Sequence, residues 1–240
     1  MASKQMTSLQ SDSRYRGSSD VIGTSHCALC SGIVSPDVPW NRALFESENF
    51  VAVPSLGALV EGWLLIVPRE HAICVGALSP SRLSEFNQFK REVSKHLVSS
   101  YGDHIYAFEH GPCGPNRTAG CGVDHAHAHL VPLDFDLIAA ARPYMPEGVS
   151  WVHASWSECT KALDGELDYL FVEEPEGSGH IAVADRFGSQ ILRKTIAAAT
   201  GKRDEFDWRS NPMHESTLRT IDRISMTRNV ELRTKACDGA

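Results

Sequence analysis

Short hydrophobic segments separated by turn residues run through the first half of the chain. Residues 42–53 predict two short strands with a turn at residues 47–49. Residues 62–68 form a continuous apolar run that is typical of a buried central strand. With a further strand over residues 104–111, the pattern predicts a mostly antiparallel sheet.

One long helix is predicted between two of these strands. Ser79 is a suitable N-cap, Pro80 fits the first helical position, and Gly102 marks the end. The positions with helical spacing between them are Leu83, Phe86, Lys90, Val93 and Leu97. A long helix that crosses antiparallel strands predicts an α+β fold.

The second half predicts a hairpin over residues 166–186, a helix over residues 188–203 that ends at Gly201, and an irregular segment that turns helical within residues 207–229. No linker-like stretch separates the halves. We therefore expect a disordered tail over residues 1–24, a domain over residues 25–135, and an extension over residues 136–234 that packs on this domain.

The helix in the extension begins with Ser189, Gln190 and Arg193. Its exposed N–H groups would suit a phosphate arm of a substrate. The alternative is an ordinary capped amphipathic helix with Ile191 and Leu192 facing inward.

Composition and charge narrow the class of protein. The chain has 240 residues, of which 42% are hydrophobic and 22% charged, as in ordinary globular proteins. Its net charge of -7 argues against broad binding to extended nucleic acid. The sequence has no membrane-length apolar run and a polar, Ser-rich start without a signal-peptide core. Seven cysteines in such a chain favour a reducing, cytoplasmic location.

The stretch GCGVDHAHAHLVPL, residues 120–133, carries three histidines at alternate positions. On a strand, His125, His127 and His129 would share one face, and the small residues Ala126 and Ala128 would share the other. The long helix could then cover the small-residue face. A row of imidazoles is costly to bury without a use, and two uses compete: metal ligation and phosphate chemistry.

This stretch resembles the His-x-His-x-His pattern of the histidine triad (HIT) family. WLLIVPREH resembles the family's strand with a Pro-basic-x-His ending, and FEHG before a Gly-rich loop resembles its uridylyltransferase and dinucleoside-tetraphosphate phosphorylase branches. The resemblance covers residues 26–133. It implies a HIT-like antiparallel sheet with a long crossing helix over residues 25–135, followed here by a C-terminal hairpin and helices.

The resemblance implies an enzyme. The family's middle histidine, here His127, attacks the α-phosphorus of a nucleotide and forms a nucleotidyl-histidine. The carbonyl of His125 fixes the His127 tautomer, and His129 contacts a leaving-group or phosphate oxygen. We therefore expect a hydrolase of nucleotide conjugates: dinucleoside polyphosphates, nucleotide esters or phosphoramidates. The alternatives are a nucleotidyltransferase or phosphorylase, a non-catalytic nucleotide-binding protein, and a metallohydrolase in which the triad holds the metal.

Substrate contacts are expected from two places. The family's nucleoside pocket corresponds here to Phe50, Val53 and Ser55. In the loop before the triad, glycines would let backbone N–H groups approach phosphate oxygens. Its candidate phosphate contacts are His110, Gly120, Cys121 and Gly122. Arg117 would add charge there or belong to a plain surface turn.

Cys27 and Cys30 have the spacing of half a zinc site, or are two ordinary thiols. The resemblance supplies the other half, since family members with this pair add the histidine of the Pro-basic-x-His motif and the first triad histidine. It thus implies a closed, structural Zn²⁺ site of Cys27, Cys30, His71 and His125. His26 and His110 are rival ligands. The expected partners are a nucleotide-containing small molecule and a second copy of the chain in a homodimer, with no membrane.

Overall fold

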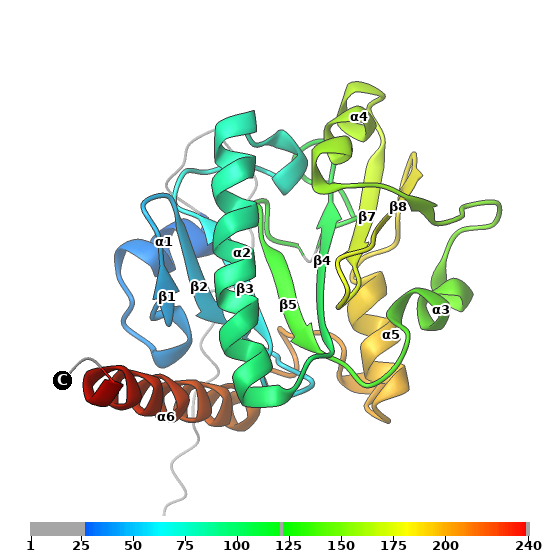
Figure 1. Ribbon diagram of the computed structural model, residues 1–240. Helices are drawn as coiled ribbons and strands as arrows, with labels where there is room; N and C mark the ends of the chain where they lie inside the picture. Colours follow the sequence, from blue (N-terminus) through cyan, green and yellow to red (C-terminus); the bar gives the residue numbers. More distant parts are fainter. Residues whose placement is uncertain (1–26, 121, 239–240) are drawn as a thin grey trace, which may run out of the picture.

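The computed structural model describes residues 27–120 and 122–238, with side chains up to residue 228. Within these residues the strands form one eight-stranded sheet in the order β1-β2-β3-β5-β4-β7-β8-β6 (Figure 1), and every pairing is antiparallel. The predicted α+β class is confirmed. The predicted tail, His26 and Cys121 lie outside the described residues.

The first half of the chain supplies five neighbouring strands: β1 (Phe45–Glu46), β2 (Phe50–Pro54), β3 (Leu64–Pro68), β5 (Ala128–Pro132) and β4 (Ile105–Gly111). Their register aligns Val53 with Leu65, Leu65 with His129, and His129 with Phe108. Directly opposite residues on neighbouring strands share a face of the sheet. This row therefore places the third triad histidine in the middle of one face.

The helix α2 (Pro80–Tyr101) covers the opposite face. Ser79 caps it, since the Ser79 Oγ accepts from the Arg82 N–H at 3.4 Å, and Gly102 ends it at φ +91°. All five positions of the predicted helical stripe are buried. Ala128 lies in the same core cluster as these residues. This confirms that α2 covers the small-residue side of the histidine strand.

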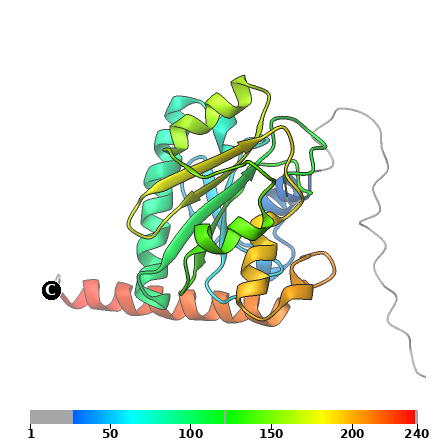
Figure 2. The ribbon, with the colours of Figure 1, turned by 90° about the vertical axis from the view of Figure 1, so that its right-hand side faces the viewer.

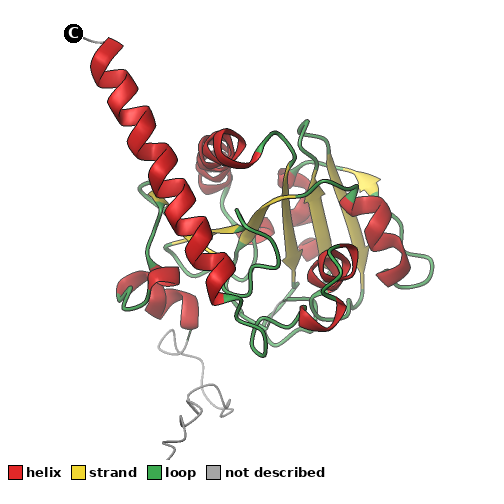
Figure 3. Cartoon of the chain, turned by 90° about the horizontal axis from the view of Figure 1, so that it is seen from below, coloured by secondary structure: helices red, strands yellow, loops and turns green. Residues whose placement is uncertain are grey.

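The second half continues the same sheet and adds helices to both faces. Its elements are α3 (Leu137–Ala141), β6 (Val152–His153), α4 (Cys159–Asp164), β7 (Asp168–Glu173), β8 (Gly179–Ala184), α5 (Ile191–Ala199) and α6 (His214–Asp238). β7 pairs with β4, so both edges of β4 are filled within one chain. The helices α3 and α5 lie on the face opposite α2 (Figure 2). Seen from below, α6 extends away from the rest of the molecule (Figure 3).

Two hydrogen bonds join α6 to the loop between β2 and β3. The Thr217 hydroxyl donates to the Ser55 carbonyl at 3.0 Å, and the Gly62 N–H donates to the Thr220 hydroxyl at 2.9 Å. The C-terminal helix thus holds the segment that leads into β3. None of the described helices combines the length and hydrophobicity needed to cross a membrane.

The histidine strand is shorter than predicted. It begins at Ala128, so His125 and His127 precede it. The ladder with β3 ends at the pair Ile66 and Ala128, and Pro68 has no N–H with which to extend it. The Ala126 N–H instead donates to the Ala72 carbonyl at 2.6 Å. The expectation that the three imidazoles form one row on a strand is therefore wrong for His125, whose ring lies among the cysteines.

Candidate active site and metal centre

Two cysteines and two histidines from three separate segments meet at one point. Cys27 is the N-cap of α1 (Ala28–Val34), and Cys30 lies in the first turn of that helix. The Nδ1 atom of His125 lies 3.3 Å from the sulfur of each cysteine, and the Nδ1 of His71 lies 3.5 Å from the Cys30 sulfur. All four ligand atoms lie within 4.8 Å of one another.

These distances fit a tetrahedral zinc ion. Zn–S and Zn–N bonds of about 2.3 and 2.0 Å at a tetrahedral angle place sulfur and nitrogen about 3.5 Å apart. The separations of 3.3–3.5 Å agree with this value. The His125 Nε2 donates to the Pro68 carbonyl at 2.9 Å, which leaves Nδ1 unprotonated toward the cysteines. Burial lowers the pKa of His125 to about 4, so the ring is neutral, as a metal ligand must be.

The backbone of His125 also orients the next triad histidine. The Nδ1–H of His127 donates to the His125 carbonyl at 2.7 Å. The proton of neutral His127 is therefore on Nδ1, and Nε2 carries the free lone pair. Burial lowers the pKa of His127, and the Arg193 guanidinium lowers it further. One residue thus joins the two sites, since the His125 side chain belongs to the cluster and its carbonyl fixes His127.

His129 is held by aromatic neighbours. Its Nδ1 accepts from the Trp63 indole N–H at 2.9 Å, and its ring stacks on Phe108 with centroids 4.4 Å apart. Its ring centroid lies 5.1 Å from that of His127. Burial and the neighbouring His127 hold the pKa of His129 well below its usual range, so the ring is neutral. Among the described residues, the buried Nε2 of His129 has no hydrogen-bond partner.

The second half of the chain closes this site through α5. The Arg193 side chain, only 2% exposed, donates to the carbonyls of Gly57 and Phe206 at 2.6 and 3.0 Å. The Leu192 N–H donates to His110 Nε2 at 3.1 Å. Ile191 and Leu192 are buried, as expected of an ordinary amphipathic helix. His110 thus accepts from the first turn of α5, a contact that the sequence analysis does not predict.

The loop before the triad is anchored by side chains of the second half. The Ser189 hydroxyl donates to the Gly120 carbonyl at 3.4 Å, and Arg209 donates to the Gly122 carbonyl at 3.0 Å. Arg117 donates to the buried carboxylate of Asp168 at 2.9 Å. This ion pair accounts for Arg117 without a phosphate.

The residues expected around the nucleoside do not form one group. Phe50 is fully buried and packs on Phe86 and Phe89 on the α2 face. Phe50 lies on the face opposite His129, because successive strand residues point to opposite faces, and this placement disfavours a nucleoside contact for it. Val53 lies on the face of His129, in a cluster with residues of α1. Ser55 is buried, and its N–H and C=O bond to Trp63 and Thr217.

Asp124 is the carboxylate directly before the triad. Its carboxylate accepts from the Asn116 N–H at 3.0 Å within the loop. It therefore adds no ligand to the triad, which disfavours a metallohydrolase built on these histidines.

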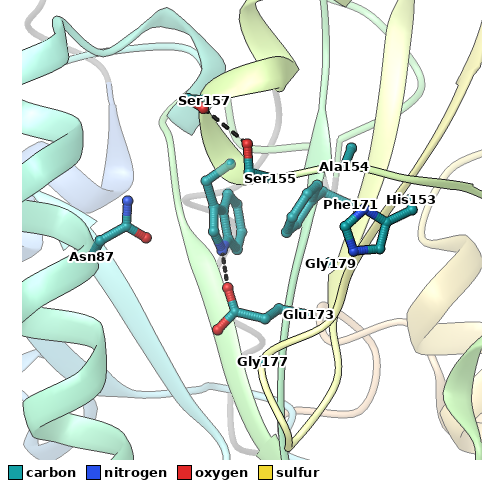
Figure 4. A pocket seen from close by; sticks show the side chains of 10 residues that line it. Asn87, His153, Ala154, Ser155, Ser157, Phe171, Glu173, Gly177 and Gly179 are labelled. Atoms are coloured by element: carbon teal, nitrogen blue, oxygen red, sulfur yellow. Dashed lines mark hydrogen bonds between the residues drawn. The ribbon is translucent and has the colours of Figure 1, made fainter.

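A cavity of about 240 Å³ lies on the other side of the sheet, between α2 and the β7–β8 hairpin (Figure 4). The Glu173 carboxylate in its wall accepts from the Trp156 indole at 2.6 Å and from the buried Lys90. Phe171, which also lines it, belongs to the core under α2. The cavity is therefore separated from His127 and His129 by the sheet.

Comparison with known proteins gives partial matches. No protein-family model matches the chain. It is 25% identical over 202 residues to a CCCH zinc finger domain-containing protein of Arabidopsis thaliana, covering 78% of this chain and 32% of that protein. The chain thus spans about a third of the curated relatives it matches. That name refers to three cysteines and one histidine, a different ligand set from the cluster described above.

Solved structures with similar folds include histidine triad proteins. A HIT family hydrolase from Clostridium thermocellum has 23% identity and a TM-score of 0.37, covering 48% of this chain and 96% of its own. Yeast Ap4A phosphorylase in complex with AMP has 14% identity and a TM-score of 0.43, covering 74% of this chain and 78% of its own. Each of these matches is partial and of low sequence identity.

Trp63 is not predicted from the sequence as a residue of the site, because it lies within an apolar run that indicates a buried strand. The register contained a signal, because Trp63 shares a face with Leu65, and Leu65 lies opposite His129.

Proposed function

We propose that the protein is a HIT-type hydrolase that acts at the α-phosphorus of nucleotide conjugates through a nucleotidyl-His127 intermediate. The observation that carries the proposal is the bond from His127 Nδ1–H to the His125 carbonyl. It leaves the Nε2 lone pair free on a neutral imidazole beside a second neutral imidazole, which suits nucleophilic attack on phosphorus.

The reaction would proceed in two displacements. The His127 Nε2 lone pair forms a bond to the α-phosphorus, and the bond from phosphorus to the leaving group breaks with its electron pair. The His129 Nε2–H, buried without a partner in the described part of the chain, donates a hydrogen bond to a phosphoryl or leaving-group oxygen. Water then attacks the same phosphorus, and the phosphorus–nitrogen bond breaks with its electron pair returning to His127 Nε2. The attacking water loses one proton to solvent, and a nucleoside monophosphate is released.

The Cys27, Cys30, His71 and His125 cluster would hold a structural Zn²⁺. Four protein ligands close the coordination sphere, so the ion would stabilise the fold rather than bind water. When bound, the metal would tie α1 to the segment before β5. This would fix the His125 carbonyl, and with it the tautomer of His127.

The proposal is tested by the products formed in heavy-oxygen water. Diadenosine tetraphosphate and adenosine 5′-phosphoramidate serve as probes, because they share an adenylyl group and differ in leaving group. Heavy oxygen in AMP from either probe supports attack by water on the α-phosphorus. Heavy oxygen only in the ATP released from diadenosine tetraphosphate, or turnover of neither probe nor of analogues with other bases, would refute it. If activity required added phosphate, the reaction would be phosphorolysis, and the proposed hydrolysis would be wrong.

The cytoplasmic location and the homodimer remain predictions. Light scattering on the purified chain measures the oligomeric state. A homodimer would have to form outside β4, whose two edges are both paired within the chain.

A further inference from the structure

Trp63 directly precedes β3, and its indole contacts the third triad histidine. It is fully buried, and its carbonyl accepts from the Ser55 N–H at 3.0 Å. The ring centroids of Trp63 and His129 lie 5.6 Å apart in an edge-to-face arrangement, and the indole N–H donates to His129 Nδ1. At 2.9 Å this bond has the usual length of an N–H hydrogen bond in a protein.

The indole nitrogen is a donor only, and this decides the protonation of its partner. Because Trp63 Nε1 always carries a proton, His129 Nδ1 must be the acceptor and must be unprotonated. A neutral imidazole then has its one proton on Nε2. The stacked Phe108 ring fixes the plane of the imidazole, and the indole fixes its rotation within that plane.

Arg193 lies over the face of the indole. The guanidinium carbon of Arg193 lies 4.9 Å from the Trp63 ring centre, and both side chains are buried. The carbonyls of Gly57 and Phe206 hold the guanidinium in turn. A cation over an indole face is attracted to it and polarises its N–H. The second half of the chain therefore reaches the triad through Arg193 and Trp63.

We propose that Trp63 is a positioning residue that holds His129 in the neutral Nε2–H tautomer, so that His129 presents a fixed donor to a phosphoryl oxygen of the substrate. The opposite tautomer would turn a lone pair toward the phosphate oxygens and repel them. The tautomer itself is a property of the free protein, and only its use in catalysis rests on the proposed function above.

The test on the unaltered protein is nuclear magnetic resonance of ¹⁵N-labelled histidine and tryptophan. We expect a ¹⁵N–¹⁵N coupling across the hydrogen bond between Trp63 Nε1 and His129 Nδ1, and a proton on His129 Nε2. Signals are assigned with His129→Asn and Trp63→Phe. Absence of the coupling, or a proton on His129 Nδ1, would overturn the proposal even if the variants did not fold.

The kinetic test measures turnover of the two adenylyl probes by two variants, each with one tryptophan replaced. Trp63→Phe keeps an aromatic side chain but removes the donor, and we expect kcat to fall by about 10- to 100-fold, the usual effect of losing one buried hydrogen bond. KM should change by less than about threefold, because the donor acts in the transition state. The matched control is Trp151→Phe, whose buried indole N–H has no partner among the described residues, and it should keep kcat within about twofold.

The outcomes separate this inference from the proposed function. A folded Trp63→Phe protein that keeps its kcat and its His129 tautomer would show that the indole positions nothing. If the wild-type chain turned over neither probe, the catalytic use would fall with the proposed function. The tautomer would then still stand or fall on the resonance experiment.

Discussion

Glu109 and His129 are buried polar groups on opposite faces of the sheet, and they differ in their hydrogen bonds. On the α2 face, Glu109 in β4 accepts from the Val75 N–H at 2.8 Å and from the Tyr169 hydroxyl, which itself accepts from the Gly76 N–H at 2.9 Å. On the α5 face, the neighbouring strand carries His129, whose Nε2 has no partner among the described residues. Both groups are almost fully buried.

The difference separates structural groups from functional ones. A buried polar group with all its partners in place stabilises one arrangement of the core. A buried donor without a partner costs about 1–3 kcal/mol, and a hydrogen bond to a bound ligand would recover this cost. On the α5 face this unpartnered group, His129 Nε2, lies on the imidazole next to His127, whose Nε2 carries a free lone pair. We infer that the α2 face holds the fold together and that the α5 face binds the substrate.

The largest expected effect is the loss of activity in His127→Ala. Removing a nucleophile lowers kcat by several orders of magnitude, on the order of 10³-fold or more. The melting temperature should change little, since the ring makes one hydrogen bond within its own segment. Activity on the two adenylyl probes and differential scanning fluorimetry check both parts. Turnover close to that of the wild type would refute the nucleophile.

The next effect concerns the cysteine–histidine cluster. Cys27→Ser combined with Cys30→Ser should remove about one zinc ion per chain, measured by elemental analysis. A stability loss of about 3 kcal/mol would lower the melting temperature by about 6–12 °C in a chain of this size. The control is Cys113→Ser, a thiol outside the cluster. Wild-type protein that contains no zinc, or that melts at the same temperature after chelation, would contradict a structural metal.

The contrast between the faces also predicts a pH effect. Burial raises the pKa of Glu109 to about 8, although its hydrogen bonds from Tyr169 and Val75 lower it. In the unfolded chain the Glu109 carboxyl ionises above its ordinary pKa of 4.5. In the folded protein it keeps its proton up to a pH of about 8. The folded state therefore binds one more proton, and its stability falls as the pH rises from about 4.5 to 8.

Glu109→Gln should remove this slope. Between about pH 5 and 8 the wild type should lose on the order of 1–3 kcal/mol of unfolding free energy relative to the variant. Urea denaturation at several pH values measures it, with Asp103→Asn as the exposed control. The other titratable groups that face Glu109 are Tyr169, Cys74 and Cys159, and burial raises the pKa of each above this range. Parallel stability curves for variant and wild type would show that Glu109 is ionised in the fold.

The smallest expected effect is that of Phe50→Leu, which tests whether Phe50 belongs to the core or to the substrate site. Phe50→Leu should lower stability by about 1 kcal/mol through poorer packing on Phe86 and Phe89. The KM for both probes should stay the same, because Phe50 lies on the α2 face. A raised KM at unchanged stability would return Phe50 to the nucleoside pocket.

Much of the fold could be predicted because its signals are local. The caps Ser79 and Gly102 and the stripe between them define α2, and turn residues bound the short strands. The four cluster residues could be named only with the family resemblance, because spacing alone identifies Cys27 and Cys30. The structure brings all four together.

The remaining features depend on contacts between distant segments. The pairing of β4 with β7 joins residues about 60 positions apart, and no local pattern encodes it. The late start of the histidine strand, at Ala128, depends on the Ala126 N–H reaching the Ala72 carbonyl. Trp63, His129 and Arg193 meet only once both halves are folded.

The central claim is the covalent intermediate on His127, and rapid acid-free quenching with intact-protein mass spectrometry tests it most directly. During turnover of either adenylyl probe, the wild-type chain should gain the mass of one adenylyl group at His127. The label should survive alkali and be lost in acid, as expected for a phosphorus–nitrogen bond, and it should be absent from His127→Ala. Turnover with no adduct at any quench time, or an adduct that persists in His127→Ala, would contradict the account.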